Sequence, residues 1–259
     1  MPRFSANLSF LYYEHDFMVR FAAARRDGFA AVEFHFPYAY DKADLARTLR
    51  QELLEVVVFN LPSGDWAAGE RGIACHPRRV QEFQDGIALA IDYARALGCP
   101  RLNCLAGLRP PGVSETRTRE TLIENLRFAA FTLKRAGIEL LMEPINNRDM
   151  PGFYVTTTHQ ALDIIDAVGS DNLRLQYDIY HAQVMEGDLA HTLEKHLAGI
   201  GHIQLADNPG RHEPGTGEIN FPFLLQHLDR LGYLGWVGCE YQPATTTAAS
   251  LTWLRQFQS

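Results

Sequence analysis

The sequence predicts a single closed (β/α)₈ barrel, and three observations lead to this fold class. Eight short apolar runs recur along the 259 residues, and segments of helical period separate most of them. Parallel neighbouring strands need a crossover helix, so this alternation favours a parallel α/β sheet. The length matches the roughly 250 residues that such a barrel uses as one domain. We therefore expect residues 1–259 to form one domain.

The predicted strands are apolar runs bounded by turn residues, and Pro37, Pro62 and Pro144 close three of them. They cover residues 3–10, 31–36, 56–61, 101–105, 138–143, 173–179, 200–205 and 235–241. An open doubly wound sheet is the competing arrangement. It is disfavoured because residues 7–10 read NLSF, where a dinucleotide-binding fold carries its glycine-rich fingerprint.

Six helices are expected between and after these strands. They cover residues 16–26, 77–97, 114–136, 158–168, 221–231 and 245–257. The third has clear boundaries, because Ser114 suits an N-cap and Gly137 suits the residue after the last turn.

Composition excludes several classes of protein. The formal net charge is −7, and the basic doublets Arg25-Arg26 and Arg78-Arg79 are isolated, so we expect no nucleic-acid partner. The four cysteines lack the spacing of a zinc site, and Cys104 and Cys239 lie in apolar runs. No apolar run approaches the roughly 20 residues of a membrane span, and no signal peptide is recognised. A cytoplasmic protein without a membrane partner is expected.

Polar residues gather at the carboxyl ends of the predicted strands. They are Glu33, His35, Asn60, Asn103, Glu143, Asp178, Gln204 and Glu240. In a barrel these ends meet at one face, where barrel enzymes carry their chemistry. Glu143 precedes Pro144, which favours extended backbone and a firmly held side chain. A structural ion pair is the plain alternative for Glu143, and a satisfied core or loop position for His181.

Carboxylate and amide oxygens at this face suit a hard divalent cation. The three carboxylates of Glu143, Asp178 and Glu240, with the amide oxygen of Gln204, form a set that Mg²⁺ or Mn²⁺ prefers. Such a cation would also offset the mutual repulsion of the carboxylates. The sequence therefore predicts a metal site at this face of the barrel.

Two loops are further candidates for substrate binding. Residues 214–220 form a glycine-rich loop after the seventh strand, a region that binds anions in many barrels, although a tight turn explains it equally well. Arg211 just before it is suited to a substrate carboxylate. Trp66 lies in a small-residue loop, where it either covers the substrate or packs ordinarily.

Several longer motifs resemble the hydroxypyruvate isomerase family, within the xylose-isomerase-like TIM barrels. They are RFSANLS at 3–9, NLP at 60–62, GDWAAGERG at 64–72, EPIN at 143–146, QYDIYH at 176–181, ADNP at 206–209 and EPGTGEIN at 213–220. The resemblance covers essentially the whole chain.

This resemblance implies an intramolecular oxidoreductase of carbohydrate metabolism. The substrate would be hydroxypyruvate, giving tartronate semialdehyde, or 2-oxotetronate, giving its 3-oxo isomer. Glu143 and Glu240 would act as proton acceptor and donor through an enediol. A divalent metal, Mg²⁺ or Mn²⁺, would bind Glu143, Asp178, Gln204 and Glu240. His181 and Arg211 would contact substrate. Many related sugar epimerases carry His where this chain carries Gln204.

Three alternatives remain open from sequence. A related sugar epimerase would use the same site. A metal-dependent phosphodiesterase on a similar barrel would need more histidine ligands and a basic groove. A non-catalytic sugar-acid binding protein would return its ligand unchanged. The choice between C3 and C4 substrates, and between a monomer and a homo-oligomer, is also open.

Overall fold

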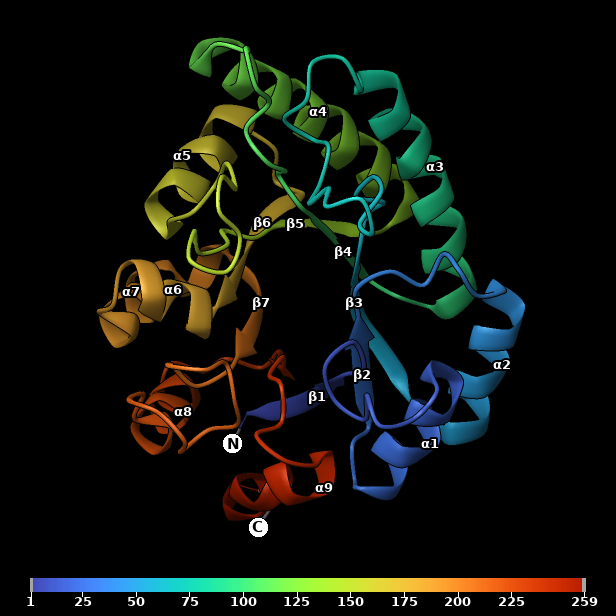
Figure 1. Ribbon diagram of the computed structural model, residues 1–259, viewed down its shortest axis with the longest axis vertical. Helices are drawn as coiled ribbons and strands as arrows, with labels where there is room; N and C mark the ends of the chain where they lie inside the picture. Colours follow the sequence, from blue (N-terminus) through green and yellow to red (C-terminus); the bar gives the residue numbers. More distant parts are fainter. Residues whose placement is uncertain (1, 258–259) are drawn as a thin grey trace.

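The computed structural model describes residues 2–257 and contains a closed barrel of eight parallel strands, with β8 paired to β1. In Figure 1 the strands form the central ring and the helices lie outside it. The strands are β1 (Arg3–Asn7), β2 (Ala31–Phe34), β3 (Glu55–Asn60), β4 (Arg101–Cys104), β5 (Glu139–Met142), β6 (Leu173–Asp178), β7 (Ile200–Leu205) and β8 (Trp236–Cys239). The predicted fold class is confirmed.

The helices follow the strands in alternation. They are α1 (Phe17–Arg26), α2 (Lys42–Glu52), α3 (Val80–Leu97), α4 (Glu115–Ala136), α5 (Thr158–Val168), α6 (Ile179–Met185), α7 (Leu189–His196), η1 (Leu197–Gly199), α8 (Phe221–Arg230), α9 (Thr247–Ser250) and η2 (Leu251–Phe257). The caps predicted for α4 are present, because Ser114 accepts a bond from Arg117 N–H and Gly137 is left-handed.

Two expectations about the helices were wrong. Sequence analysis placed no helix in α2, α6 or α7, although Asp41 caps α2 through the N–H groups of Ala43 and Asp44. The expected helix over 245–257 is instead the single turn α9 followed by the 3₁₀ segment η2. Leu251 and Leu254 are both buried, and a spacing of three residues suits a helix with three residues per turn.

Polar side chains occupy alternate positions along the strands that line the barrel. Ser5 and Asn7 alternate in β1, Gln176 and Asp178 in β6, and His202 and Gln204 in β7; all six are buried. Successive side chains of a strand point to opposite faces, so each pair shares the barrel interior. Phe4, Ala6 and their counterparts face the helices and belong to the main hydrophobic core.

A second, smaller apolar cluster is separate from this main core. It consists of Ala31, Val57, Val58 and Leu141, with Trp236 packed against it. These residues come from β2, β3, β5 and β8. Ala31 and Trp236 begin β2 and β8, and Val57, Val58 and Leu141 lie within β3 and β5, so this apolar cluster extends from the amino-terminal end toward the polar side chains of the carboxyl-terminal end.

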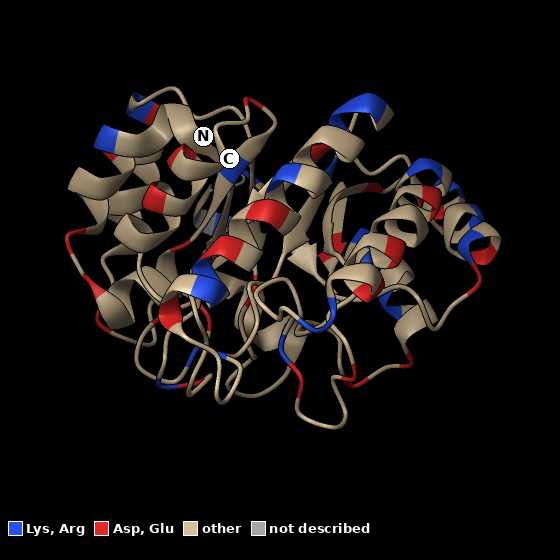
Figure 2. Ribbon diagram, turned by 90° about the horizontal axis from the view of Figure 1, so that it is seen from above, with Lys and Arg blue, Asp and Glu red and all other residues tan. Residues whose placement is uncertain are grey.

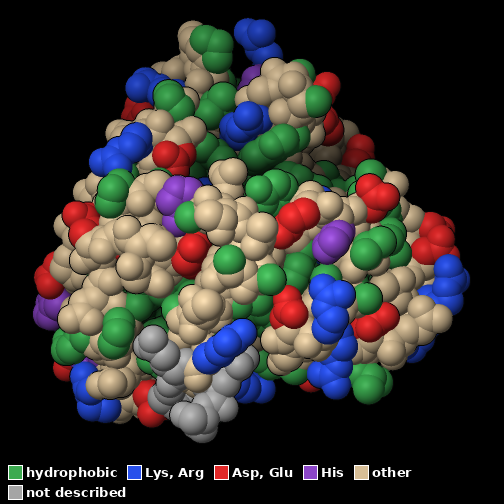
Figure 3. Space-filling view, turned by 60° about the horizontal axis from the view of Figure 1, so that its bottom comes forward, with side chains coloured by type: hydrophobic (Ala, Val, Ile, Leu, Met, Phe, Trp, Pro, Cys, Tyr) green, Lys and Arg blue, Asp and Glu red, His purple; other side chains and the backbone are tan. Residues whose placement is uncertain are grey.

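Charge on the outside of the barrel is mixed in sign. Figure 2 shows acidic and basic residues distributed along the outer helices, and Figure 3 shows both signs interspersed on one face. Residues 2–257 contain no helix whose length and apolar character would let it cross a membrane. All four cysteines are free and buried, as expected for Cys104 and Cys239.

Candidate active site

Three carboxylates meet at the carboxyl-terminal end of the barrel, as predicted. Glu143 directly follows β5, Asp178 ends β6, and Glu240 directly follows β8. Each is buried, with at most 6% of its side chain exposed. Asp178 is also the N-cap of α6, because its Oδ1 accepts the N–H of Tyr180 at 2.7 Å. The strand ends and this cap fix the carboxylates close together.

A group of donor atoms suited to a cation lies among them. Ligand atoms of Glu143, Asp178 and His181 all fall within 4.8 Å of one another. Asp178 Oδ2 is buried and has no hydrogen-bond partner in the described part of the chain. A buried carboxylate oxygen without a partner is costly unless it coordinates something. The carboxylates therefore fit a divalent metal.

Arg211 supplies positive charge to the same space. Its Nη2 lies 2.6 Å from Glu240 Oε1 and 3.5 Å from Asp178 Oδ2. The guanidinium also lies over the rings of Phe10 and Tyr180, at 4.7 and 5.2 Å from their centroids. Its backbone has a φ of 57°, an uncommon left-handed conformation for a residue other than glycine. Such strain persists where surrounding contacts impose it, and it often marks functional positions.

Side-chain amides connect the two glutamates. Asn103 Nδ2 and Gln176 Nε2 donate to Glu143 Oε2 at 2.8 and 2.9 Å. Gln176 Nε2 also donates to Gln204 Oε1 at 2.7 Å, and Gln204 Nε2 donates to Glu240 Oε2. A continuous hydrogen-bonded chain therefore runs from Glu143 through two glutamines to Glu240.

Asn146 sets the tautomer of His181. The amide nitrogen of Asn146 lies 2.6 Å from His181 Nδ1, and its oxygen accepts the backbone N–H groups of Arg148 and Asp149. Because the amide must donate to Nδ1, the neutral ring carries its proton on Nε2. Nε2 lies 3.6 Å from Asp178 Oδ2 and 3.8 Å from Glu143 Oε1. His181 thus presents an N–H donor at the carboxylates, and with both ring nitrogens in use the ligands left for a cation are the carboxylate oxygens.

The pKa values of the two catalytic candidates, Glu143 and Glu240, are shifted in opposite directions. Burial, with the charges of Glu240 and Asp178, raises the pKa of Glu143 well above its usual range. Burial would also raise the pKa of Glu240, but the hydrogen bond from His35 and the nearby charges of His35 and Arg211 hold it below the usual range. Burial and the Arg211 charge lower the pKa of His181, which keeps the imidazole neutral. One glutamate therefore favours its proton and the other its charge.

The suggested anion site in the loop over 214–220 is wrong. Asp207 Oδ2 accepts the N–H groups of Gly215 and Gly217 at 2.8 and 2.9 Å, and Oδ1 accepts that of Ile219 at 3.1 Å. The chain supplies its own buried anion to this loop, so these N–H groups are not free for a substrate carboxylate. Trp66 is half-buried and packs on Phe36, with the Arg71 guanidinium 4.2 Å from its ring centroid.

The structure brings all the predicted site residues together: Glu143, Asp178, His181, Gln204, Arg211 and Glu240. Sequence analysis missed Asn7, Gln176, His202 and Asp207. The first three have a signal that could have found them, because each lies on an inward-facing strand position, and Gln176 and His202 stand two residues before Asp178 and Gln204. Asp207 lies outside the strands, and no periodicity marks it.

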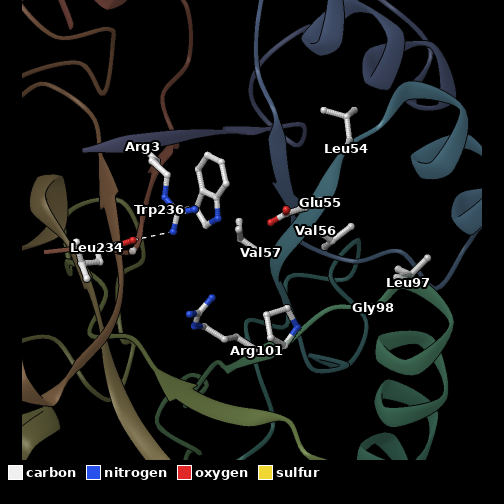
Figure 4. A pocket seen from close by; sticks show the side chains of 12 residues that line it. Arg3, Leu54, Glu55, Val56, Val57, Leu97, Gly98, Arg101, Leu234 and Trp236 are labelled. Carbon is white, nitrogen blue, oxygen red and sulfur yellow. Dashed lines mark hydrogen bonds between the residues drawn. The ribbon is translucent and has the colours of Figure 1, made fainter. Parts of the chain in front are cut away.

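A separate cavity of about 590 Å³ lies at the opposite end of the barrel. Its lining includes Arg3, Glu55, Arg101 and Trp236, which begin β1, β3, β4 and β8 (Figure 4). Arg3 donates to the carbonyl oxygen of Leu234 at 2.7 Å and lies over the Trp236 ring. This cavity shares no lining residue with the carboxylate cluster.

A closed barrel with clustered carboxylates at the carboxyl ends of its strands defines a (β/α)₈-barrel enzyme. The family model described as "Xylose isomerase-like TIM barrel" matches residues 21–257. Hydroxypyruvate isomerase of Escherichia coli (strain K12) is 55% identical over 100% of both chains. The 2-oxo-tetronate isomerase of Cupriavidus necator is 49% identical over 99% of both chains.

A solved structure named AP endonuclease, family 2, from Brucella melitensis has a TM-score of 0.97 and 45% identity, with 100% of both chains covered. The chain therefore belongs to the xylose isomerase-like TIM barrel family and, within it, to the hydroxypyruvate isomerase family of enzymes.

Proposed function

We propose that this protein is an isomerase of small hydroxy-keto acids that works by proton transfer through an enediol. The substrate is hydroxypyruvate, which gives tartronate semialdehyde, or 2-oxotetronate, which gives 3-oxotetronate. The names of the relatives at 55% and 49% identity support this reaction. The observation that carries it is the buried pair Glu143 and Glu240, which meet at the carboxyl-terminal end of the barrel and are joined by hydrogen bonds through Gln176 and Gln204.

The pair supplies one proton acceptor and one proton donor. In hydroxypyruvate, Glu240 takes a proton from the hydroxyl-bearing carbon next to the carbonyl, and the C–H electrons form the enediol double bond. Glu143 then returns a proton to the former carbonyl carbon, and after the product leaves, solvent takes the proton from Glu240 and reprotonates Glu143. Groups whose environments push their pKa values apart are suited to these two roles. The hydroxyl proton passes between the two substrate oxygens in the same reaction.

His181 and Arg211 orient the substrate. The Nε2–H of His181 donates to a substrate oxygen, because Asn146 fixes that tautomer. The Arg211 guanidinium pairs with the substrate carboxylate, for which its charge and planar donors are suited. Phe10 and Tyr180 limit the movement of this guanidinium.

Glu143, Asp178 and Glu240 would hold a divalent cation, Mg²⁺ or Mn²⁺. Asp178 Oδ2, which accepts no hydrogen bond, and the three neighbouring carboxylates support this assignment. When bound, the cation polarises the carbonyl and stabilises negative charge on the substrate oxygens. The family resemblance adds Gln204 as a fourth ligand, and this stays a prediction. A cytoplasmic location and a role in carbohydrate metabolism belong to the same proposal.

A proton NMR time course in deuterated water tests the function. Hydroxypyruvate and 2-oxotetronate are incubated in parallel with the protein, with and without Mg²⁺ or Mn²⁺. We expect product, with deuterium at the carbon that receives the proton, and the relative rates name the substrate. Recovery of both compounds unchanged contradicts the proposal and favours a binding protein. A nuclease assay with Zn²⁺ covers the phosphodiesterase alternative, which the endonuclease name of the Brucella melitensis structure raises.

A further inference from the structure

We propose that Asp207 is a positioning residue for Arg211: its carboxylate holds the backbone of residues 207–219 in the conformation that presents the Arg211 guanidinium to the substrate carboxylate. This inference rests on the proposed role of Arg211. It goes beyond that role, because it assigns control of substrate affinity to a fully buried side chain that acts only through the backbone.

The Asp207 carboxylate is bonded to four backbone N–H groups. Its Oδ2 accepts from Gly215 and Gly217 at 2.8 and 2.9 Å. Its Oδ1 accepts from Asn208 and Ile219 at 2.9 and 3.1 Å. In the described part of the chain, all hydrogen bonds of this carboxylate come from backbone groups. A buried carboxylate requires such partners, so it fixes the backbone that supplies them.

Backbone hydrogen bonds close the segment that contains Arg211. The N–H of Asp207 donates to the carbonyl oxygen of His212 at 2.8 Å, and the two residues form an antiparallel bridge. The N–H of Glu218 donates to the carbonyl oxygen of Asn208 at 2.7 Å. Arg211 therefore lies in a short loop between Asp207 and His212, and the chain that follows is bonded back to the start of this loop.

The backbone conformation of Arg211 is one that surrounding contacts must impose. Its φ of 57° is uncommon for a residue other than glycine. Its carbonyl oxygen accepts the N–H of Gln242 at 2.8 Å, and its Nη2 lies 2.6 Å from Glu240 Oε1. If the loop were released, Arg211 would relax to a more favourable backbone conformation, and its guanidinium would leave the site.

Gly217 makes the close approach of the loop to Asp207 possible. A Cβ on Gly217 would collide with the carbonyl oxygen of Asn208 and with Asp207 Oδ1. A side chain at this position would therefore push the loop away from the carboxylate. The glycine-rich sequence over 214–220 thus serves to bring backbone N–H groups to Asp207.

Steady-state kinetics with the proposed substrates test the positioning role. In Asp207→Asn, the amide NH₂ opposes two of the four N–H groups whichever way it turns. A displacement of about 1 Å in a binding group can cost about 100-fold. We expect KM to rise at least about tenfold with kcat within about threefold, the pattern of lost substrate binding. Gly217→Ala should raise KM in the same direction.

Asp41→Asn is the matched control. Asp41 caps α2, and its Oδ1 accepts the N–H groups of Ala43 and Asp44 at 2.8 and 3.1 Å. The same substitution there removes the same charge from a carboxylate that also binds backbone N–H groups. We expect wild-type KM and kcat in this variant.

A double-mutant cycle tests whether Asp207 acts through Arg211. Arg211→Met removes the guanidinium, so Asp207→Asn should then change KM by less than about twofold. A KM change as large in the Arg211→Met background as in the wild-type background would overturn the proposal. A fall in kcat without a KM effect in Asp207→Asn would also contradict it.

Limited digestion with trypsin tests the loop without any substrate. Trypsin cleaves after arginine, and Arg211 is held in the closed loop, with only 15% of its side chain exposed. Cleavage tracks the population of the opened loop. We expect the peptide that begins at His212 to appear at least about tenfold faster in Asp207→Asn and Gly217→Ala than in wild type and Asp41→Asn. Cleavage after Arg119 within α4 reports unfolding of the whole protein in the same digest.

Outcomes for the two proposals are distinguishable. Wild-type cleavage after Arg211 in folded Asp207→Asn contradicts the positioning role. If Asp207→Asn does not fold, Gly217→Ala decides the same question. If the wild-type protein turns over neither substrate, the proposed function fails, while the trypsin digest still decides whether Asp207 holds the loop that carries Arg211.

Discussion

The two ends of this barrel both carry glutamates and arginines but arrange them differently. At the amino-terminal end, Glu139 lies between Arg101 and Arg174, at 3.3 and 3.6 Å, and the three side chains are 25–37% exposed. At the carboxyl-terminal end, three carboxylates lie together, and two of them, Asp178 and Glu240, pair with the guanidinium of Arg211; all three carboxylates are nearly enclosed. Opposite charges are balanced at the first end, whereas like charges are held together at the second.

The difference shows what marks a functional cluster in this fold. Partly solvated ion pairs cost little to form and contribute little to stability. Buried carboxylates that repel one another are unfavourable in the protein alone, and they persist where ligand or substrate chemistry requires them. The number of charged residues does not distinguish the two ends, but the balance and burial of the charges do.

Replacing either of the proposed catalytic glutamates should produce the largest difference in effect between the two ends of the barrel. Glu143→Gln and Glu240→Gln should each lower turnover by about 10³-fold while the fold is retained, as checked by circular dichroism. Glu143→Gln should still exchange the substrate C–H with deuterium, because Glu240 remains as the base, whereas Glu240→Gln should not. Exchange in Glu240→Gln but not in Glu143→Gln would reverse the assigned roles.

Arg211→Lys should have the next largest effect. A lysine keeps the charge but loses the planar donor pair and the contacts with Phe10 and Tyr180. Charge-assisted hydrogen bonds contribute about 1.5–3 kcal/mol, so we expect KM to rise by about 10- to 100-fold. Initial-rate kinetics measure this change. An unchanged KM would contradict the assignment of the substrate carboxylate to Arg211.

In the metal-free protein, the free energy of unfolding should depend on pH through the carboxylates at the carboxyl-terminal end of the barrel. Folding raises the pKa of Glu143, so the folded state holds this proton more tightly, and stability falls as pH rises above the ordinary value of 4.5. The lowered pKa of Glu240 acts only below that value. With EDTA present, urea unfolding between about pH 5 and 7 should show a wild-type slope steeper than that of Glu143→Gln by up to about 1.4 kcal/mol per pH unit.

The smallest effect is expected at the amino-terminal end. Glu139→Gln removes both ion pairs, but partly exposed pairs contribute only about 0–1 kcal/mol. We expect a change in unfolding free energy within that range and wild-type kinetics. A loss of turnover would mean that the two ends are coupled through the barrel, which would contradict the separate roles assigned to them.

Periodicity predicted the barrel well because each strand buries an apolar face. It failed for α2, whose sequence is largely polar, and for the short helices after Asp178, where one stretch from Ile179 contains both α6 and α7. The end of the chain was predicted as one helix because its apolar residues recur closely. Leu251 and Leu254 are instead buried by the 3₁₀ helix η2, which has a tighter turn than an α-helix.

The site was predictable as far as strand position determines it. Residues at strand ends must meet in a closed barrel, so Glu143, Asp178 and Glu240 could be placed together from sequence. The direction of an amide could not, because it depends on partners from other strands. Gln204 contacts Glu33 of β2, Gln176 of β6 and Glu240, which directly follows β8. The hydrogen bonds from the loop over 214–220 to the Asp207 carboxylate were likewise not predictable, because they form only when the loop folds over Asp207.

Proton exchange between solvent and the site depends on what the barrel contains below it. The apolar cluster described above consists of Ala31, Val57, Val58, Leu141 and Trp236. Val57 and Trp236 of this cluster also line the amino-terminal cavity, so the wall of that cavity is partly apolar. We therefore expect Glu143 and Glu240 to exchange protons with solvent at the carboxyl-terminal end of the barrel, where we propose that the substrate binds. A bound substrate limits this exchange, so Glu240 and Glu143 regain their starting protonation states only after the product leaves.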